Sequence, residues 1–309
     1  MVCKLGTKYE VRIVDDLAPI ADTEPRALDP SLGEPEHLVL PSALSSRFGD
    51  IRFLGAGGMG TVYRATDRQL NRDVAIKILH DSDPETSRML LREARALARL
   101  EHDHACKVYE VDAEGERPCI VMQFVPGQSL DKAGQHMALE EKVEVLRQVA
   151  LALHEAHRLG IVHRDVKPGN IMVERADNGK YKAYIMDFGI AREIGRTSQT
   201  YSSFAGTPSY MAPEQATGDV AAMDRRTDVY SLGATLYDVV AGRAPFEGSN
   251  PVAVLQKLLI EEALPLRKAC QDVPADLEAI VMKCLEKEPK RRYDSAKAFA
   301  DDLQRFLDR

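Results

Sequence analysis

The sequence lacks the features of a secreted, membrane-spanning or nucleic-acid-binding protein. Its 5 cysteines are odd in number and contain no Cys-x-x-Cys pair, which indicates free thiols in a reducing compartment. No apolar run approaches the roughly 18 residues of a membrane span, and the first residues contain no signal-peptide block. Acidic residues outnumber basic ones by 48 to 41, so the formal charge of -7 gives no reason to expect a nucleic-acid partner. We therefore expect a cytoplasmic protein without a membrane span in this chain.

The first 45 residues differ in composition from the rest of the 309-residue chain. They carry 4 basic and 8 acidic residues and are interrupted by 5 prolines. Residues 8–14 alternate well enough to form a short strand, but the acidic segment after them is typical of a linker or tail. Two interpretations stay open: a disordered extension, or a regulatory arm whose strand adds to a sheet edge in this molecule or in a partner.

A glycine-rich segment lies between two stretches of strand-like composition, residues 51–54 and 61–65. It contains Gly55, Ala56, Gly57, Gly58 and Gly60. Glycines with this spacing let the backbone approach phosphate groups without a Cβ clash. A Rossmann dinucleotide site uses the same pattern but needs a helix directly after it. The strand-like residues that follow favour a phosphate-covering loop between two strands.

Lys77 stands inside an apolar strand predicted over residues 74–79. A buried ammonium group is costly unless anions meet it. Nucleotide phosphates and a carboxylate would meet this need, and Glu93 lies in the helix predicted over residues 87–100. The alternatives are a strand lysine that reaches solvent and a glutamate on the surface of a helix.

Residues 163–170 carry polar groups spaced for handling a phosphate and a hydroxyl together. Asp165 can accept a proton from a hydroxyl, Lys167 can contact a phosphoryl group, and Asn170 can supply an oxygen ligand to Mg²⁺. A helix predicted over residues 143–154 precedes this loop and a short buried strand follows it. We therefore expect the loop to be held between two packed elements.

Asp187 ends a predicted strand and opens an Asp-Phe-Gly sequence 22 residues after Asp165. A carboxylate in this place suits Mg²⁺ bound to phosphates. A polar segment then leads to Gly-Thr-Pro and to an Ala-Pro-Glu sequence that ends at Glu214. Its clustered hydroxyl residues are Thr197, Ser198, Thr200, Ser202 and Ser203.

These motifs resemble those of protein kinases, most closely the bacterial eukaryotic-like (Hanks-type) serine/threonine kinases. Six motifs occur in the family's order over about residues 47–307. The resemblance implies an α+β, two-lobed protein kinase fold. Its small N-lobe would hold an antiparallel β-sheet plus one main helix, and its larger C-lobe would be mostly α-helical. We expect an N-terminal extension over residues 1–45, the N-lobe over 46–126 and the C-lobe over 127–309.

The resemblance further implies ATP and Mg²⁺ as cofactors, with Mn²⁺ as a substitute. Lys77, paired with Glu93, would engage the α and β phosphates. Met122 would be the gatekeeper, while Gln123 and Val125 would offer main-chain groups to adenine. The residues implied in ATP binding are Gly55, Ala56, Gly57, Gly58, Gly60, Val62, Ala75, Lys77, Met122, Gln123, Val125 and Met172.

For the chemical step, the resemblance implies that Asp165 orients and deprotonates the acceptor hydroxyl and that Lys167 offsets charge on the transferring group. Asn170 and Asp187 would hold Mg²⁺. Arg164 would receive a phosphate placed on the activation segment over residues 187–214. The candidate phosphorylation sites in that segment are Thr197, Thr200, Ser202 and Ser203. Two structural contacts are also implied: Asp228 with the catalytic-loop backbone, and Arg292 with Glu214.

The expected function is transfer of the ATP γ-phosphoryl group to Ser and Thr hydroxyls of proteins, with autophosphorylation of the activation segment and a homodimer for transfer in trans. The alternatives are a pseudokinase scaffold that binds nucleotide and a kinase-like enzyme that phosphorylates a small molecule. Intact Lys77, Asp165 and Asp187 argue against the scaffold, and the complete segment over residues 206–214 argues against the small-molecule enzyme. His102 and His104 occupy a stretch where the family has His-Pro-Asn-Ile. Two histidines this close suggest a metal site, but the sequence shows no third ligand for one.

Overall fold

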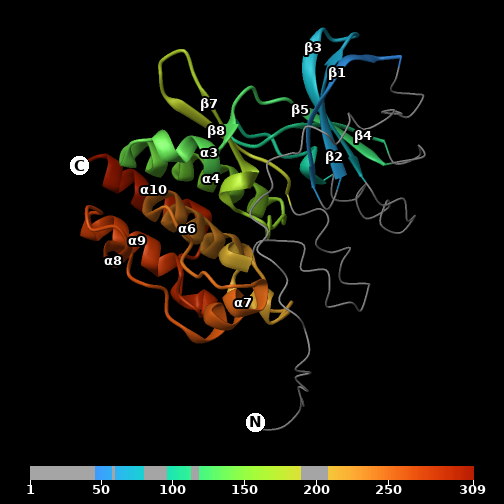
Figure 1. Cartoon of the computed structure of the whole chain (residues 1–309). Helices are drawn as coiled ribbons and strands as arrows, with labels where there is room; N and C mark the ends of the chain where they lie inside the picture. The colour runs from blue at the N-terminus through green and yellow to red at the C-terminus, as the bar shows by residue number, and fades with distance from the viewer. Residues whose placement is uncertain (1–45, 58–59, 80–95, 113–117, 189–207) are drawn as a thin grey trace. The chain divides into compact units, whose positions relative to one another are not determined.

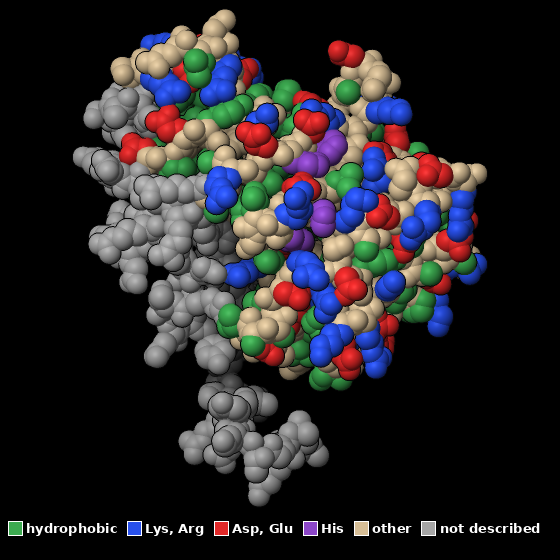
Figure 2. Space-filling view, turned by 180° about the vertical axis from the view of Figure 1, so that it is seen from behind, with side chains coloured by type: hydrophobic (Ala, Val, Ile, Leu, Met, Phe, Trp, Pro, Cys, Tyr) green, Lys and Arg blue, Asp and Glu red, His purple; other side chains and the backbone are tan. Residues whose placement is uncertain are grey.

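The computed structural model describes residues 46–57, 60–79, 96–112, 118–188 and 208–309 (Figure 1). The strand predicted over residues 8–14 lies outside these ranges. In the described part, no helix is both long enough and apolar enough to cross a membrane. Figure 2 shows Lys and Arg side chains interspersed with Asp and Glu over one face of the described residues.

The N-terminal part is a five-stranded antiparallel sheet with the strand order β1-β2-β3-β5-β4. β1 and β2 meet at the glycine turn, where Gly57 pairs with Gly60. A strand therefore follows the glycines, as predicted, and the dinucleotide-binding alternative is wrong. β3 is buried along most of its length because its residues are largely apolar. The strands are β1 (Phe48–Gly57), β2 (Gly60–Asp67), β3 (Arg72–Leu79), β4 (Val108–Asp112) and β5 (Cys119–Gln123).

A second, three-stranded antiparallel sheet has the order β6-β7-β8. It comprises β6 (Gln128–Ser129), β7 (Ile171–Arg175) and β8 (Tyr181–Ile185). Gly127 leads into β6, and a Cβ added there would lie 2.1 Å from the backbone oxygen of Val173. Only glycine allows these two segments of the backbone to approach this closely.

The rest of the described chain is helical, and polar side chains cap several of the helices. Asp224, Asn250 and Ser295 each accept a hydrogen bond from a backbone N–H in the first turn of α6, α7 and α10, respectively. α6 ends at Gly242, whose φ of 71° favours glycine. The α-helices are α3 (Leu130–Ala133), α4 (Leu139–Arg158), α5 (Pro213–Ala216), α6 (Arg225–Ala241), α7 (Pro251–Ile260), α8 (Leu266–Ala269), α9 (Ala275–Cys284) and α10 (Ala296–Leu307). The 3-10 helices are η1 (Gly134–His136), η2 (Pro168–Asn170), η4 (Pro208–Tyr210) and η5 (Pro289–Arg291).

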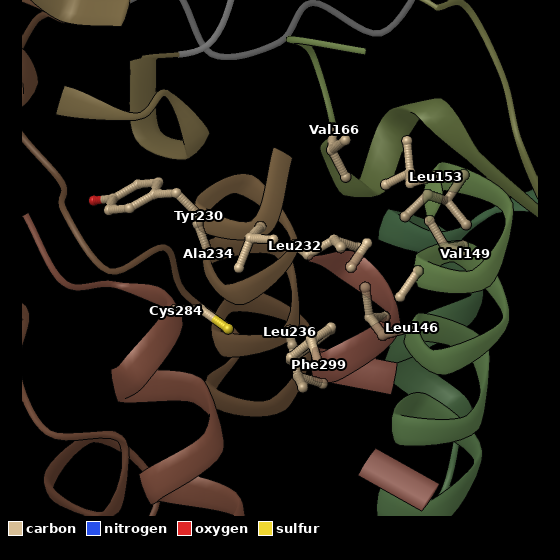
Figure 3. Packing of buried hydrophobic residues seen from close by; sticks show 14 of the residues in the cluster. Leu146, Val149, Leu153, Val166, Tyr230, Leu232, Ala234, Leu236, Cys284 and Phe299 are labelled. Carbon is tan, nitrogen blue, oxygen red and sulfur yellow. The ribbon is translucent and has the colours of Figure 1, made fainter. Parts of the chain in front are cut away.

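The main core lies between α4, α6 and α10. Leu146, Val149 and Leu153 of α4 face Leu232 and Leu236 of α6 (Figure 3). Fully burying one such side chain contributes about 1.5–3 kcal/mol. The predicted catalytic loop packs into this core through Val166, which is 1% exposed. The loop is therefore anchored to the main core.

Candidate active site

The predicted catalytic loop lies between α4 and β7, and its polar side chains converge on one carboxylate. Lys167 Nζ lies 3.0 Å from Asp165 Oδ2. The side-chain amide of Asn170 donates to the same oxygen at 2.9 Å and to the Asp165 backbone oxygen at 2.8 Å. The short helix η2 begins at Pro168 and turns the chain so that Asn170 can make both contacts. A candidate base, a cation and an amide thus lie within hydrogen-bonding distance of one another.

Asp228 of α6 holds the backbone of this loop. Its carboxylate accepts hydrogen bonds from the backbone N–H groups of His163 at 2.8 Å and Arg164 at 2.7 Å. His157 Nε2, from the last turn of α4, lies 2.7 Å from Asp228 Oδ2. Burial alone would raise the pKa of Asp228, but the hydrogen bonds from the His157 side chain and the His163 backbone oppose it, and the pKa lies below its usual value. Because the carboxylate stays ionised, it can hold Arg164 at a φ of 64°, a strained value for a residue other than glycine.

His163 connects the catalytic loop to the segment that carries Asp187. Its Nε2 lies 2.9 Å from the backbone oxygen of Met186, and its Nδ1 accepts the Asp165 N–H at 3.2 Å. Its ring packs against Phe188, with 4.6 Å between the ring centroids. Burial lowers the pKa of His163, which keeps the ring neutral at pH 7. These partners require a neutral ring with its proton on Nε2.

Lys77 is buried in β3, and its ammonium group meets a carboxylate, as its burial required. Nζ lies 2.8 Å from Asp187 Oδ1, with the lysine side chain 11% exposed and the aspartate side chain 41% exposed. Asp187 has a φ of 48°, a costly conformation for a residue with a Cβ. Glu93, the partner predicted from sequence, lies outside the described residues. The structure therefore brings together the predicted phosphate-binding lysine and one predicted metal ligand.

The register of the first sheet places most of the residues implied in ATP binding on one face. Residues directly opposite one another in a ladder share a face, and so do alternate residues along a strand. Val62 and Ile120 both stand opposite Lys77, and Met122 stands opposite Ala75. The pairings of Gly55 with Val62 and of Gly57 with Gly60 extend the same face to the glycine turn.

The glycines of this turn differ in what the surrounding protein requires. A Cβ at Gly60 would lie 2.3 Å from the backbone oxygen of Ile78, so packing alone demands glycine there. At Gly55 and Gly57, an added Cβ would meet no described atom within 4 Å. Ala56 is exposed between them, and Gly58 lies outside the described residues. Space beside the backbone at Gly55 and Gly57 fits a turn that a ligand approaches closely.

The residues predicted to contact adenine lie at the end of β5 and in β7 of the second sheet. Met122 and Val125 are buried at the end of β5 and just beyond it, with 6% and 5% exposure. Between them, the Gln123 N–H donates to the backbone oxygen of Lys107 at 2.8 Å. Met172 belongs to the second sheet, where it pairs with Tyr184.

The end of the predicted activation segment is fixed by a buried ion pair. Arg292 donates to both carboxylate oxygens of Glu214, at 2.7 and 2.8 Å. Thr227 donates to the same carboxylate at 2.9 Å. The Arg292–Glu214 contact implied by the resemblance is thus present. Thr197, Thr200, Ser202 and Ser203 lie outside the described residues.

Sequence reasoning missed two polar residues that support the loop. His157 contacts Asp228 across 71 residues, and Gln215 donates to the Arg164 backbone oxygen at 2.9 Å across 51 residues. Neither spacing has a local signature, because both contacts depend on how α4 and α5 pack against the loop. Across the described ranges, no group of three or more His, Cys, Asp or Glu side chains could hold a metal ion.

Four histidines with lowered pKa values predict how stability depends on pH. Burial lowers the pKa values of His102, His104, His154 and His163 in the folded chain. As the pH falls below the unfolded value of about 6.5, the unfolded chain binds protons that the folded chain does not, so stability decreases. We expect a lower unfolding temperature at pH 5.5 than at pH 7.5. Carboxyl groups with lowered pKa values lose their contribution only below about pH 4.

Scanning calorimetry of two variants checks the assignment. Replacing His154 with leucine should reduce the dependence on pH, whereas His136→Ala, at an exposed histidine, should leave it unchanged. An unfolding temperature that stays level or rises toward pH 5.5 would contradict the lowered pKa values.

Comparisons with known proteins agree with this geometry. The family model described as "Protein kinase domain" matches residues 48–303. The serine/threonine-protein kinase PknB of Mycobacterium tuberculosis is 40% identical over 281 residues, covering 87% of this chain and 44% of PknB. A probable serine/threonine-protein kinase of Clostridium perfringens is 39% identical over 270 residues, covering 85% of this chain and 38% of that protein. The chain thus spans less than half the length of these relatives.

A solved structure confirms the fold class. The crystal structure of Rad53, residues 1–466, in complex with AMP-PNP has a TM-score of 0.68 and 24% sequence identity to this chain. The similarity covers 84% of this chain and 65% of that one. The antiparallel sheet of the N-terminal part and the helical remainder agree with the predicted two-lobed fold.

Proposed function

The chain belongs to the protein kinase family, and from this premise we propose that it transfers the γ-phosphoryl group of ATP to Ser and Thr hydroxyls of proteins. Members of this family use ATP and a divalent metal ion. The observation that carries the proposal is the convergence of Lys167 and Asn170 on the Asp165 carboxylate. Lys77 and Asp187 complete the set of groups that phosphoryl transfer needs. A nucleotide-binding scaffold without chemistry would not require all five residues.

The shared face of the first sheet supports the proposed ATP site. Val62, Ala75 and Met122 would pack against the adenine base. Gln123 and Val125 would offer main-chain groups to the edge of the base, and the glycine turn would cover the phosphates. The Lys77 ammonium group has three N–H donors, so it would engage the phosphates beside its contact with Asp187, and we propose Glu93 as a further partner.

Asn170 and Asp187 fit a divalent metal ion by the chemistry of their donor atoms. The amide nitrogen of Asn170 is engaged by Asp165, which directs the amide oxygen elsewhere. The Asp187 carboxylate is 41% exposed. Oxygen donors of these two kinds suit Mg²⁺, with Mn²⁺ as a substitute. When bound, the ion would neutralise charge on the phosphates.

The chain's own groups account for the transfer step. Asp165 would accept the proton of the acceptor hydroxyl and orient its oxygen toward the γ-phosphorus. Lys167, already 3.0 Å from Asp165, would offset negative charge on the transferring group. Asp228 and His157 would keep the loop in place, so positioning supplies much of the catalysis.

The proposed regulation centres on the activation segment. A phosphate on Thr197, Thr200, Ser202 or Ser203 would add charge that Arg164 can bind. The segment beyond residue 207 is firmly held, because Ser231 donates to the Tyr210 backbone oxygen and Arg292 pairs with Glu214. We propose that the chain phosphorylates a second copy of itself through a transient homodimer.

The domain boundaries proposed from sequence remain an extension over residues 1–45, an N-lobe over 46–126 and a C-lobe over 127–309. We place the domain in the cytoplasm because its reaction consumes ATP. Cys106, Cys119, Cys270 and Cys284 are free thiols, which suits a reducing compartment.

Identification of the acceptor group tests the proposed function. The purified chain is incubated with γ-labelled ATP and Mg²⁺, with either a mixed protein substrate or a set of small alcohols. We expect label in protein as phosphoserine and phosphothreonine. Label only in small alcohols would favour the small-molecule phosphotransferase instead.

A further inference from the structure

The outer edge of β8 is paired with groups from two other parts of the chain. On one side of Ala183, the Gln148 side chain donates to the Tyr181 backbone oxygen at 3.1 Å and accepts the Ala183 N–H at 2.9 Å. On the other side, His104 Nδ1 lies 3.0 Å from the Ala183 backbone oxygen. A buried strand edge without such partners would leave its polar groups unsatisfied at considerable cost.

The backbone of residues 104–106 continues this pairing to the end of β8. Ile185 N–H donates to the His104 backbone oxygen at 2.9 Å, and Cys106 N–H donates to the Ile185 backbone oxygen at 3.0 Å. Both backbone groups of Ile185 are therefore held by residues 104–106. Asp187 lies two residues farther along the chain.

Residues 104–107 also contact the end of β5. Cys106 Sγ donates to the Gln123 backbone oxygen at 3.6 Å, and the Gln123 N–H donates to the Lys107 backbone oxygen at 2.8 Å. Burial and the charge of Asp187 raise the pKa of Cys106 to about 12, so the thiol keeps the proton that it donates. Residues 104–107 thus form hydrogen bonds both with β8, which leads to Asp187, and with Gln123, which is proposed to contact adenine.

We propose that residues 104–106 position Asp187 for the metal–nucleotide complex and that His104 is the side chain on which this positioning depends. The inference rests on the proposed role of Asp187 as a metal ligand. Without the His104 ring, the Ala183 backbone oxygen loses the donor of its hydrogen bond, and the edge of β8 is held less firmly near Asp187. The Gln123 contact with Lys107 is a main-chain bond, so it survives the loss of this side chain.

Binding of AMP-PNP to the whole chain, measured by calorimetry with and without Mg²⁺, tests the proposal. For His104→Ala we expect the gain in affinity that Mg²⁺ provides to fall by about tenfold, as is typical when a group that orients a metal ligand is removed. Metal-free affinity should stay unchanged, because it reports on the adenine contacts. A merely structural role would lower the unfolding temperature and leave the ratio of the two affinities as in wild type, which would overturn the proposal.

Conservative variants make the test specific. Asparagine at position 104 can place an amide N–H near the position of the histidine Nδ1, so His104→Asn should restore the ratio. His104→Gln extends the amide by one methylene and should restore less. This pair decides the question if His104→Ala does not fold, because equal ratios for both variants would contradict the proposal. His136→Ala, at an exposed histidine, is the matched control and should behave as wild type.

The effect of Mg²⁺ on the AMP-PNP affinity of wild type separates a failure of this inference from a failure of the proposed metal site. If Mg²⁺ gives wild type no gain in AMP-PNP affinity, the metal site itself is wrong and the positioning role falls with it. If wild type gains affinity and His104→Ala gains as much, only the positioning role is overturned.

Discussion

Replacing Asp165 with asparagine is expected to lower kcat by about 10²–10⁴-fold while ATP affinity stays unchanged. The amide is close in size to the carboxylate and can still accept a hydrogen bond from Asn170, so the loop should keep its shape. It cannot take the proton of the acceptor hydroxyl, and it gives Lys167 no charge to pair with. Steady-state kinetics give the turnover, and calorimetry with AMP-PNP gives the affinity.

The matched control is Asp177→Asn, which makes the same substitution at an exposed residue in the turn between β7 and β8. It should leave both quantities unchanged. Comparable turnover in Asp165→Asn and wild type would mean that the base lies elsewhere. A loss of ATP affinity together with turnover would mean that Asp165 supports the shape of the site.

Replacing Arg292 with leucine should lower the free energy of unfolding by about 3–5 kcal/mol, because it leaves the Glu214 carboxylate buried without its cation. The side chains of both residues are nearly inaccessible, at 0% and 4% exposure. Thr227 would remain as a donor to Glu214, but a hydroxyl does not neutralise the charge. For a domain of this size, such a loss lowers the unfolding temperature by roughly 10 °C.

Two further variants separate the buried charge from other effects of the Arg292 substitution. Adding Glu214→Leu to Arg292→Leu removes the stranded carboxylate and should recover part of the lost stability. Lys297→Ala breaks an exposed ion pair with Asp301 and should change the free energy of unfolding by no more than about 1 kcal/mol. A small effect of Arg292→Leu alone would show that Glu214 finds other partners or takes up a proton.

Local sequence was enough to predict the elements around the site. The strands on both sides of Gly57 and Gly60 were predicted from the strand-like composition of residues 51–54 and 61–65, which also spoke against a helix after the glycines. The helix α4 before the loop was predicted from the apolar spacing of residues 143–154. Asp165, Lys167 and Asn170 lie within one loop, so their spacing along the chain already limits their separation in space.

Contacts across long stretches of chain could not be predicted in the same way. The sequence showed that Lys77 needs an anion but did not show that Asp187 provides it, 110 residues away. Likewise, His104 stood out only as a departure from the family pattern, and its role depends on the edge of β8. Such contacts form when separate elements pack, so no local pattern specifies them.

The most direct test of phosphoryl transfer by this chain is the mass of the purified protein after incubation with ATP and Mg²⁺, followed by peptide mapping beside Asp165→Asn. We expect added phosphate groups in wild type, between Thr197 and Ser203, and none in the variant. Equal phosphate in both would contradict Asp165 as the catalytic base. No phosphate in either, with ATP still bound, would contradict self-phosphorylation and favour a nucleotide-binding scaffold.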